Sequence, residues 1–208
     1  MNIGIIGSGH IGGALTRRLS ALGHDVAVAN SRGPQSLTDL AAESGATAGT
    51  VETAARESDV VVLAVPLRVV PDLPADAFRG KIVVDANNYY AGRDGRIAEI
   101  ADGRRTSSRW TSDLLRDATV VKAFNTMFAQ HLLEKGLPPG TDGRIALPVA
   151  GDDDDAKRIV MGLVDELGFD PVDAGGLDDS WRQEPGTAVA GAETDAAGLR
   201  EALASAHR

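Results

Sequence analysis

The chain has 208 residues, 43% hydrophobic and 25% charged, with a net charge of -9 and no cysteine. Its length suits one well-buried α/β domain with a small appendage, and its composition is that of an ordinary soluble globular protein. The missing cysteines exclude disulfides, thiolate nucleophiles, iron–sulfur clusters and cysteine-bound zinc, so any redox chemistry needs a bound organic cofactor. Because 21 basic residues are scattered among 30 acidic ones, we expect no nucleic-acid partner.

The sequence also predicts a cytoplasmic protein with no membrane partner. No apolar run approaches the roughly 20 residues that a membrane span needs. The chain opens directly on an apolar run, residues 2–6, without the basic segment and cleavage site of a signal peptide. The oligomeric state is left open, with a homodimer among the options.

Short apolar runs alternate with amphipathic stretches, which is the pattern of a doubly wound, mostly parallel sheet covered by helices. We therefore predict an α/β fold of the Rossmann type. The run 59–65 is apolar on both faces and is expected in the middle of the sheet. The predicted strands are 2–6, 25–30, 46–49, 59–65, 81–86, 119–124, 144–150 and 170–174.

Two helices are indicated by apolar residues at three- and four-residue spacing, one over 11–22 and one over 159–167. Each is closed by a glycine, Gly23 or Gly168. Residues 92–109 are expected to form a loop excursion with at most a short helix inside it. The early tail from residue 175 is expected to be irregular, and residues 196–206 to form a final helix.

A glycine-rich segment joins the first strand to the first helix, and it contains Gly7, Ser8, Gly9, His10, Ile11 and Gly12. The pattern alone is weak, but a strand before it and an amphipathic helix after it are what dinucleotide binding requires. Gly7 permits the tight turn, Gly9 lets a pyrophosphate approach the backbone, and Gly12 lets the helix and strand pack closely. His10 either reaches the pyrophosphate or ribose or points outward.

The end of the second strand predicts NADP(H) as the cofactor. Where an Asp or Glu would bind the ribose hydroxyls of NAD, the chain carries Asn30, and Asp25 lies a strand length away. Ser31 and Arg32 follow, and their hydroxyl and guanidinium suit a phosphate dianion. The alternative, that these two residues only form a solvated loop, is left open.

The run Asp152–Asp155 resembles a calcium or magnesium cluster, but it directly precedes a helix. Acidic residues at that place cap free amides and complement the helix dipole. We therefore expect capping and assign no metal ligand.

Ligands of an open parallel sheet lie beyond the carboxyl ends of its strands. The loops there contain Ala64, Val65 and Pro66, then Asn87 and Asn88, and then Asn125 and Thr126. We assign the first four of these residues to the nicotinamide side of the cofactor, and Asn88, Asn125 and Thr126 to the substrate. Their amides, hydroxyl and neighbouring aromatic rings could clamp a planar ring.

These loops contain no convincing acid–base pair, so no catalytic residue is assigned. Reduction of a ketone or imine needs a proton donor near the new hydroxyl or amine. Lys122 is a candidate, although a lysine inside a strand is more often paired or at an edge. A flavin-like ring stabilises the transferred hydride itself and would not need such a donor.

Several segments along residues 1–176 resemble the NADP oxidoreductases that depend on coenzyme F420. They are Gly4–Gly12, Leu22–Val26, Asn30–Arg32, Ala64–Pro66, Val121–Thr126, Val149–Asp153 and Pro171–Gly175. The resemblance implies hydride transfer between the nicotinamide of NADPH and a deazaflavin ring. It also assigns Gly7–Gly12 to the phosphate loop, Ser31 and Arg32 to the 2'-phosphate, and Ala64–Pro66 to the nicotinamide.

The tail departs from this family at Trp181–Gly186, where the resemblance implies an apolar C-terminal helix beside the acceptor site and the subunit contact. The nucleotide-binding part is also similar to the cytosolic domain of membrane metalloreductases, which pass the hydride to a flavin. These observations leave the electron acceptor open between a deazaflavin and a flavin.

We therefore predict an NADP-binding Rossmann domain over 1–118 and a small C-terminal lobe over 119–208, packed on the same sheet at the acceptor side. The predicted function is hydride transfer between NADP(H) and F420 or a flavin-like small-molecule acceptor. One alternative is a reductase of small imines or carbonyls, but such enzymes usually add a large helical domain for which 208 residues leave no room. The other is a non-catalytic NADP sensor with a closed pocket beside the nicotinamide.

We predict that NADPH binds at least about tenfold tighter than NADH, and that Arg32→Ala reduces this preference. A lost charge-assisted contact to phosphate costs on the order of 1.5–3 kcal/mol. Calorimetric titration with both cofactors measures the ratio, and equal affinities in the wild-type protein would contradict the assignment.

Overall fold

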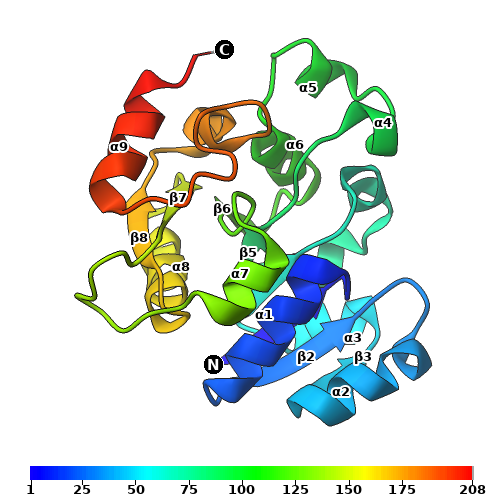
Figure 1. Ribbon diagram of the computed structural model, residues 1–208. Helices are drawn as coiled ribbons and strands as arrows, with labels where there is room; N and C mark the ends of the chain where they lie inside the picture. The colour runs from blue at the N-terminus through cyan, green and yellow to red at the C-terminus, as the bar shows by residue number, and fades with distance from the viewer. Residues whose placement is uncertain (208) are drawn as a thin grey trace.

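The computed structural model describes residues 1–207 (Figure 1). Within them a sheet of eight strands runs in the order β3-β2-β1-β4-β5-β6-β7-β8. Its neighbouring strands pair in parallel, except that β6 and β7 are antiparallel. The strands are β1 Asn2–Ile6, β2 Asp25–Ala29, β3 Thr47–Gly49, β4 Val60–Leu63, β5 Ile82–Asp85, β6 Thr119–Lys122, β7 Ala146–Gly151 and β8 Asp170–Asp173. The predicted α/β fold is confirmed.

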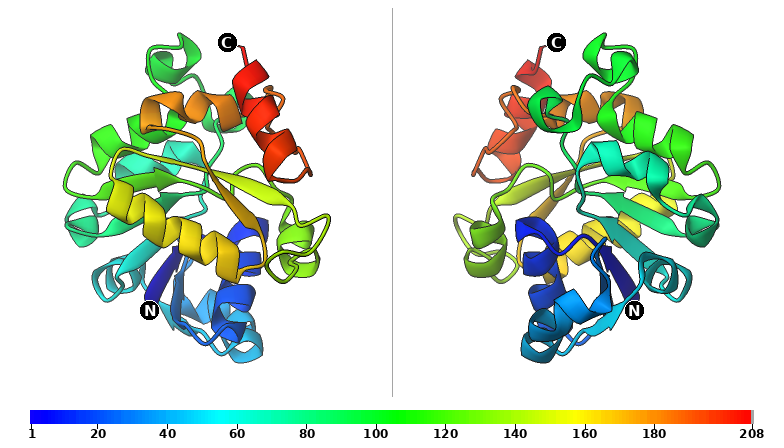
Figure 2. Two further views of the ribbon diagram at one scale, coloured as in Figure 1. Left: turned by 90° about the vertical axis from the view of Figure 1, so that its left-hand side faces the viewer. Right: turned by 90° about the vertical axis from the view of Figure 1, so that its right-hand side faces the viewer.

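Helices cover both faces of this sheet (Figures 1 and 2). The α-helices are α1 His10–Ala21, α2 Thr38–Ser44, α3 Val51–Arg56, α4 Ala91–Asp94, α5 Ala98–Ala101, α6 Ser107–Leu114, α7 Ala129–Glu134, α8 Asp154–Glu166 and α9 Ala196–Ser205. Four 3₁₀ segments in the described chain are η1 Pro34–Leu37, η2 Leu67–Asp72, η3 Ala75–Phe78 and η4 Leu177–Gln183. In every view α9 and η4 lie at the opposite end from the N-terminus.

The central strand β4 shows why these segments form a two-sided sheet. Val60 and Val62 pack into one core with α1, α7 and α8, whereas Val61 and Leu63 pack into a second core with α3 and η3. Successive side chains of a strand point to opposite faces, so a strand covered on both sides must be apolar throughout. The prediction that this run lies mid-sheet is confirmed, because β4 pairs with β1 and β5.

The C-terminal part continues the same sheet. β6 extends the parallel pairing of β5, and β7, α8 and β8 form a strand-helix-strand unit whose two strands are parallel. A third apolar cluster joins β7 and β8 to α9. The border between residues 118 and 119 therefore falls inside the sheet, and the division into domain and lobe stays a prediction.

Two sequence expectations need correction. Residues 92–109 are not mainly a loop: α4, α5 and the start of α6 occupy this stretch, each too short to show a helical apolar period. The strand predicted to reach residue 124 ends at Lys122, because Phe124 has a φ of 63°. A residue in this left-handed region cannot continue a strand. The expected final helix is confirmed as α9.

No helix among residues 1–207 has the length and apolarity that a membrane crossing requires.

The acidic run caps α8, as predicted. The Asp153 carboxylate accepts a hydrogen bond from the Ala156 amide at 2.8 Å, and Asp154 and Asp155 lie in the first turn. Asp152 has another role, since it accepts from the Leu177 amide at 2.9 Å and thereby holds the start of η4. Residues 1–207 contain no group of three or more potential metal ligands.

We predict that Asp153→Ala lowers the free energy of unfolding by about 1 kcal/mol, the usual cost of a lost N-cap. Asp155→Ala is the matched control, because Asp155 lies in the same first turn of α8 and pairs with Arg158, but accepts no cap hydrogen bond in the described residues. Urea denaturation measures both variants. A chelator should leave the melting temperature unchanged, and a drop reversed by calcium or magnesium would contradict capping as the role of the run.

Candidate functional site

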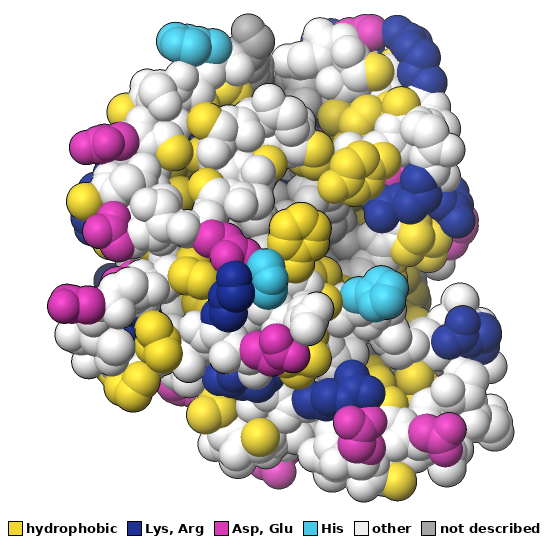
Figure 3. All heavy atoms as spheres, in the orientation of Figure 1, with side chains coloured by type: hydrophobic (Ala, Val, Ile, Leu, Met, Phe, Trp, Pro, Cys, Tyr) yellow, Lys and Arg dark blue, Asp and Glu magenta, His cyan; other side chains and the backbone are white. Residues whose placement is uncertain are grey.

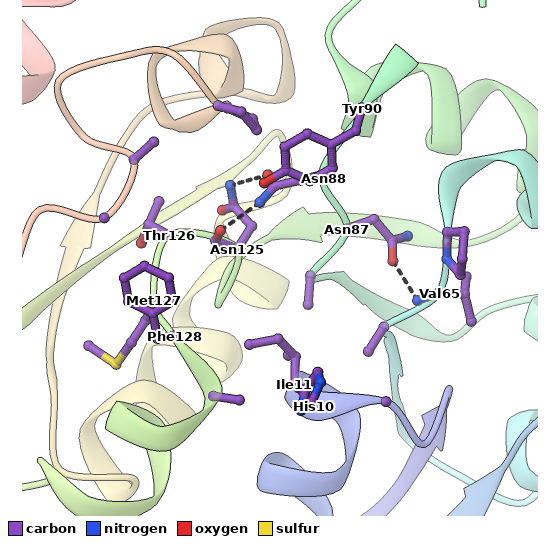
Figure 4. A pocket seen from close by; sticks show the side chains of 18 of the residues that line it. His10, Ile11, Val65, Asn87, Asn88, Tyr90, Asn125, Thr126, Met127 and Phe128 are labelled. Carbon is purple, nitrogen blue, oxygen red and sulfur yellow. Dashed lines mark hydrogen bonds between the residues drawn. The ribbon is translucent and has the colours of Figure 1, made fainter. Parts of the chain in front are cut away.

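A cavity of about 830 Å³ opens at the carboxyl ends of β1, β4, β5 and β6. Figure 3 shows the hollow near the middle of the face seen in Figure 1, and Figure 4 shows it from close by. Five segments form most of the lining, and we name them here. They are the glycine loop Gly7–Gly12, the β4 loop Ala64–Pro66, the β5 loop Ala86–Tyr90, the β6 loop Ala123–Phe128 and the C-terminal wall Pro185–Gly191. Arg93 and the start of α7, Ala129–His131, complete the lining.

The glycine loop has room for a Cβ atom at one of its glycines and no room at two others. A Cβ on Gly12 would overlap the Gly7 carbonyl oxygen, and a Cβ on Gly7 would overlap the Ala64 carbonyl oxygen. At Gly9, by contrast, a Cβ would meet nothing within 4 Å. Gly9 is the N-cap of α1, whose first turn carries no acidic residue. A helix N-terminus with open space in front of it is suited to a phosphate group.

The end of β2 is tied to the glycine loop. The Asn30 Nδ2 donates to the Ser8 hydroxyl at 3.0 Å, and the Asn30 Oδ1 accepts from the Arg32 amide at 2.9 Å. Ser31 and Arg32 are exposed beyond it. Within residues 1–207 the Arg32 guanidinium makes no ion pair, so it is available to a phosphate beside the glycine loop.

The β4 and β5 loops are joined by Asn87, which is only 3% exposed. Its Oδ1 accepts from the Val65 amide at 2.8 Å, as Figure 4 shows. Its Nδ2 is buried and has no hydrogen-bond partner within residues 1–207. Such an unpaired donor on a cavity wall is a place for an oxygen of a bound ligand. The predicted residues Ala64, Val65 and Pro66 lie beside it on the same cavity.

The predicted substrate residues form an amide cluster across the cavity. Asn88 Nδ2 donates to the Asn125 carbonyl at 2.8 Å, and Asn125 Nδ2 donates to Asn88 Oδ1 at 3.0 Å (Figure 4). Buried Gln183 of η4 completes the cluster, because its Nε2 donates to Asn125 Oδ1 at 3.0 Å. Thr126 lines the cavity, and its carbonyl accepts from the Gly191 amide at 3.0 Å.

Two aromatic rings stand at the rim of the cavity. Phe128 is 66% exposed and Tyr90 is 47% exposed. The Arg93 guanidinium lies 5.2 Å from the centre of the Tyr90 ring. Burial acts to raise the pKa of Asp94, but hydrogen bonds from Arg93 and from the Tyr90 amide outweigh it and hold that pKa below its usual value. The charged Asp94 thus keeps Arg93 in place beside the rim.

Sequence reasoning missed the C-terminal wall. Pro185, Gly186, Ala190 and Gly191 line the cavity although they lie far along the chain from every loop predicted there. The wall is anchored just beyond Gly191, where Glu193 contacts Lys135 and His131 of the α7 region. The hydrogen bond from Lys135 lowers the pKa of Glu193, and the charge of His131 adds to this shift. The resemblance implied a C-terminal element beside the acceptor site, but it assigned no site residue within 185–191.

Lys122 does not face the cavity as a free amine. Its side chain is fully buried, and Nζ donates to the Asn87 carbonyl and to the Ser107 hydroxyl, the latter at 3.2 Å. The Asp85 carboxylate lies 3.7 Å from Nζ. A lysine with its protons bound in this way is a poor general acid for a substrate.

Comparison with known proteins agrees with this geometry. The family model of the coenzyme F420-dependent NADP oxidoreductases matches residues 2–89, which include the glycine loop, the end of β2 and the β4 loop. The solved structure of the hypothetical protein SMa0349 from Sinorhizobium meliloti has 36% sequence identity and a TM-score of 0.79, covering 92% of this chain and 94% of its own. Over residues 2–89 the chain belongs to this family of NADP oxidoreductases.

Two further proteins are similar to most of this chain. A structure from Arthrobacter sp. FB24, provisionally named an F420-dependent NADP reductase, has 25% identity and a TM-score of 0.72, covering 85% of this chain and 86% of its own. The rat metalloreductase STEAP3 is 32% identical over 177 residues, which are 84% of this chain and 34% of STEAP3. The chain spans about a third of the length of the curated relatives it matches.

We predict that Gly9→Ala weakens NADPH binding at least about tenfold, because the new methyl occupies open space that a pyrophosphate would use, and that it costs no more than the roughly 1 kcal/mol expected for alanine at an N-cap. Gly12→Ala should lower stability as well, since its Cβ overlaps the backbone of Gly7. Gly162→Ala in α8 is the control, because its Cβ also meets nothing within 4 Å. Calorimetry and thermal melts measure the three variants, and wild-type affinity in Gly9→Ala would contradict the assigned phosphate site.

Proposed function

We propose that this chain transfers a hydride between NADP(H) and a planar flavin-like ring, with the deazaflavin of coenzyme F420 as the first choice. The glycine loop would hold the pyrophosphate, Ser31 and Arg32 the 2'-phosphate, and the β4 loop with Asn87 the nicotinamide. The residues present fit this cofactor in two respects: Gly9 leaves space at a helix N-terminus, and Asn87 Nδ2 lacks a partner in the described chain. NADPH supplies the hydride when bound.

The observation that carries the proposal is the chemistry of the cavity wall. It combines amides and exposed aromatic rings, and Lys122 beneath it is buried with Nζ bonded to the Asn87 carbonyl and the Ser107 hydroxyl. His131 also lines the cavity, with its Nδ1 against the Glu193 carboxylate. A carbonyl or imine acceptor needs a proton donor at the reacting atom, whereas a flavin-like ring spreads the incoming charge over its own atoms.

The residues of the wall would then act by holding two rings face to face. Phe128 and Tyr90 offer stacking surfaces at the rim, and the Asn88–Asn125 pair fixes the β5 and β6 loops on the far side. Correct placement of the reacting atoms can supply a large part of the rate without an acid or base. The similarity to STEAP3, a metalloreductase, supports keeping flavins and ferric chelates among the acceptors to be tested.

The alternative of a non-catalytic sensor predicted a closed pocket, whereas the cavity of about 830 Å³ is open beside the β4 loop. Imine reductases share the fold at 16% identity, which carries no information about the reaction. The homodimer, the cytoplasmic location and the lack of nucleic-acid and membrane partners stay predictions from the sequence.

We expect NADPH to be oxidised by F420, or failing that by flavin mononucleotide, in anaerobic stopped-flow mixing that also includes ferric chelates and a panel of ketones and imines. Phe128→Ala should raise the KM for the ring acceptor at least about fivefold and leave NADPH affinity unchanged, because a stacking surface is lost. Leu133→Ala, an exposed residue of α7 outside the cavity, is the matched control.

Reduction of ketones or imines alone would show that the acceptor class is wrong. If no acceptor oxidises NADPH while the cofactor still binds, the sensor is the better explanation.

A further inference from the structure

A buried ion pair lies directly beneath the cavity. Asp85 ends β5 and Lys122 ends β6, and the two residues are register partners in neighbouring parallel strands. Both side chains are completely buried, with 3.7 Å between Lys122 Nζ and Asp85 Oδ2. Taking two charges out of water is costly, and well-packed apolar side chains often serve stability equally well. The pair therefore calls for an explanation other than stability.

The ion pair holds the backbone of Asn87 from both sides. Asp85 Oδ1 accepts from the Asn87 amide at 3.1 Å, and Lys122 Nζ donates to the Asn87 carbonyl. Asn87 in turn holds the β4 loop through Oδ1 and the Val65 amide at 2.8 Å. A chain of direct contacts thus leads from the buried charges to the loop predicted to contact nicotinamide.

The first turn of α6 encloses the pair. Ser108 donates to Asp85 Oδ2 at 2.6 Å, and the Ser107 hydroxyl accepts from Lys122 Nζ at 3.2 Å. Both serines are completely buried. Each oxygen of Asp85 and the ammonium of Lys122 therefore have fixed partners, which leaves Asn87 little freedom to move.

We propose that Asp85 and Lys122 are positioning residues that orient Asn87, so that its unpaired Nδ2 donates to an oxygen of the nicotinamide half of NADPH. A donor that is buried without a partner is costly unless a ligand satisfies it. The rigid backbone of Asn87 keeps this donor at the cavity wall instead of letting it turn to a protein acceptor. The inference rests on the proposed NADPH binding and not on the identity of the acceptor.

The test compares two ligands that differ in the nicotinamide half. Calorimetry gives the Kd of NADPH and of 2',5'-ADP, which carries the adenosine half alone, for the wild type, Asn87→Ala, Lys122→Met and the double variant. We expect each single variant to bind NADPH about tenfold more weakly and 2',5'-ADP within about twofold of wild type. The double variant should lose no more than either single variant, because both changes remove the same contact.

Two further variants distinguish the proposed effect from a general loss of folding. Lys122→Met leaves the Asp85 charge unpaired, so Asp85→Asn combined with Lys122→Met removes both charges at similar volume and should show the same selective loss. Arg144→Met is the control: Arg144 is a buried partner of Asp165 and Asp170 away from the cavity, and its loss should leave the ratio of the two affinities unchanged.

The proposal would be overturned if the Asp85→Asn/Lys122→Met variant lost affinity for NADPH and 2',5'-ADP equally. It would also be overturned if the losses in Asn87→Ala and Lys122→Met were additive in their double variant, or if the single variants bound NADPH like the wild type. If wild-type protein fails to bind NADPH, the proposed cofactor fails and this inference with it. Selective loss of NADPH binding in a protein that reduces no acceptor would support the inference and overturn only the acceptor.

Discussion

No side chain fits where the first turn of α1 meets the end of β1, and the site depends on this contact. Gly12 lies against the Gly7 carbonyl, and Gly7 lies against the carbonyl of Ala64, so that α1, β1 and the β4 loop meet backbone to backbone. Because of this approach, the N-terminus of α1 opens at the carboxyl edge of the sheet. His10 and Ile11 of α1 then line the same cavity as the β4, β5 and β6 loops.

Features with a local cause could be predicted from the sequence. β1 has the predicted bounds, and each other strand begins and ends within two residues of its predicted limits. Short apolar runs between polar turns are typical of buried strands. Gly23 and Gly168 have positive φ where their helices end. The cap at Asp153 follows from chemistry within four residues. The site residues of the β4, β5 and β6 loops come together for a related reason, since parallel strands end at one edge.

Features with a long-range cause could not be predicted. Gln183 contacts Asn125 across 58 positions, and no pattern in either segment indicates that pairing. The direction of β7 against β6 is set by the course of residues 123–145, not by the strands themselves. A lysine inside a strand, such as Lys122, suggests a partner, but nothing in the sequence indicates Asp85, which only the register of β5 and β6 brings beside it.

The glycine loop and the C-terminal wall line one cavity although they lie far apart in the sequence. The nucleotide elements lie within residues 2–89, whereas the C-terminal wall follows β8 and is anchored through the Gly191 amide and Glu193. Substitutions or insertions in that wall would change the shape of the cavity while the glycine loop stays the same. The shape of the cavity can therefore change through one late segment of the chain without any change in residues 2–89.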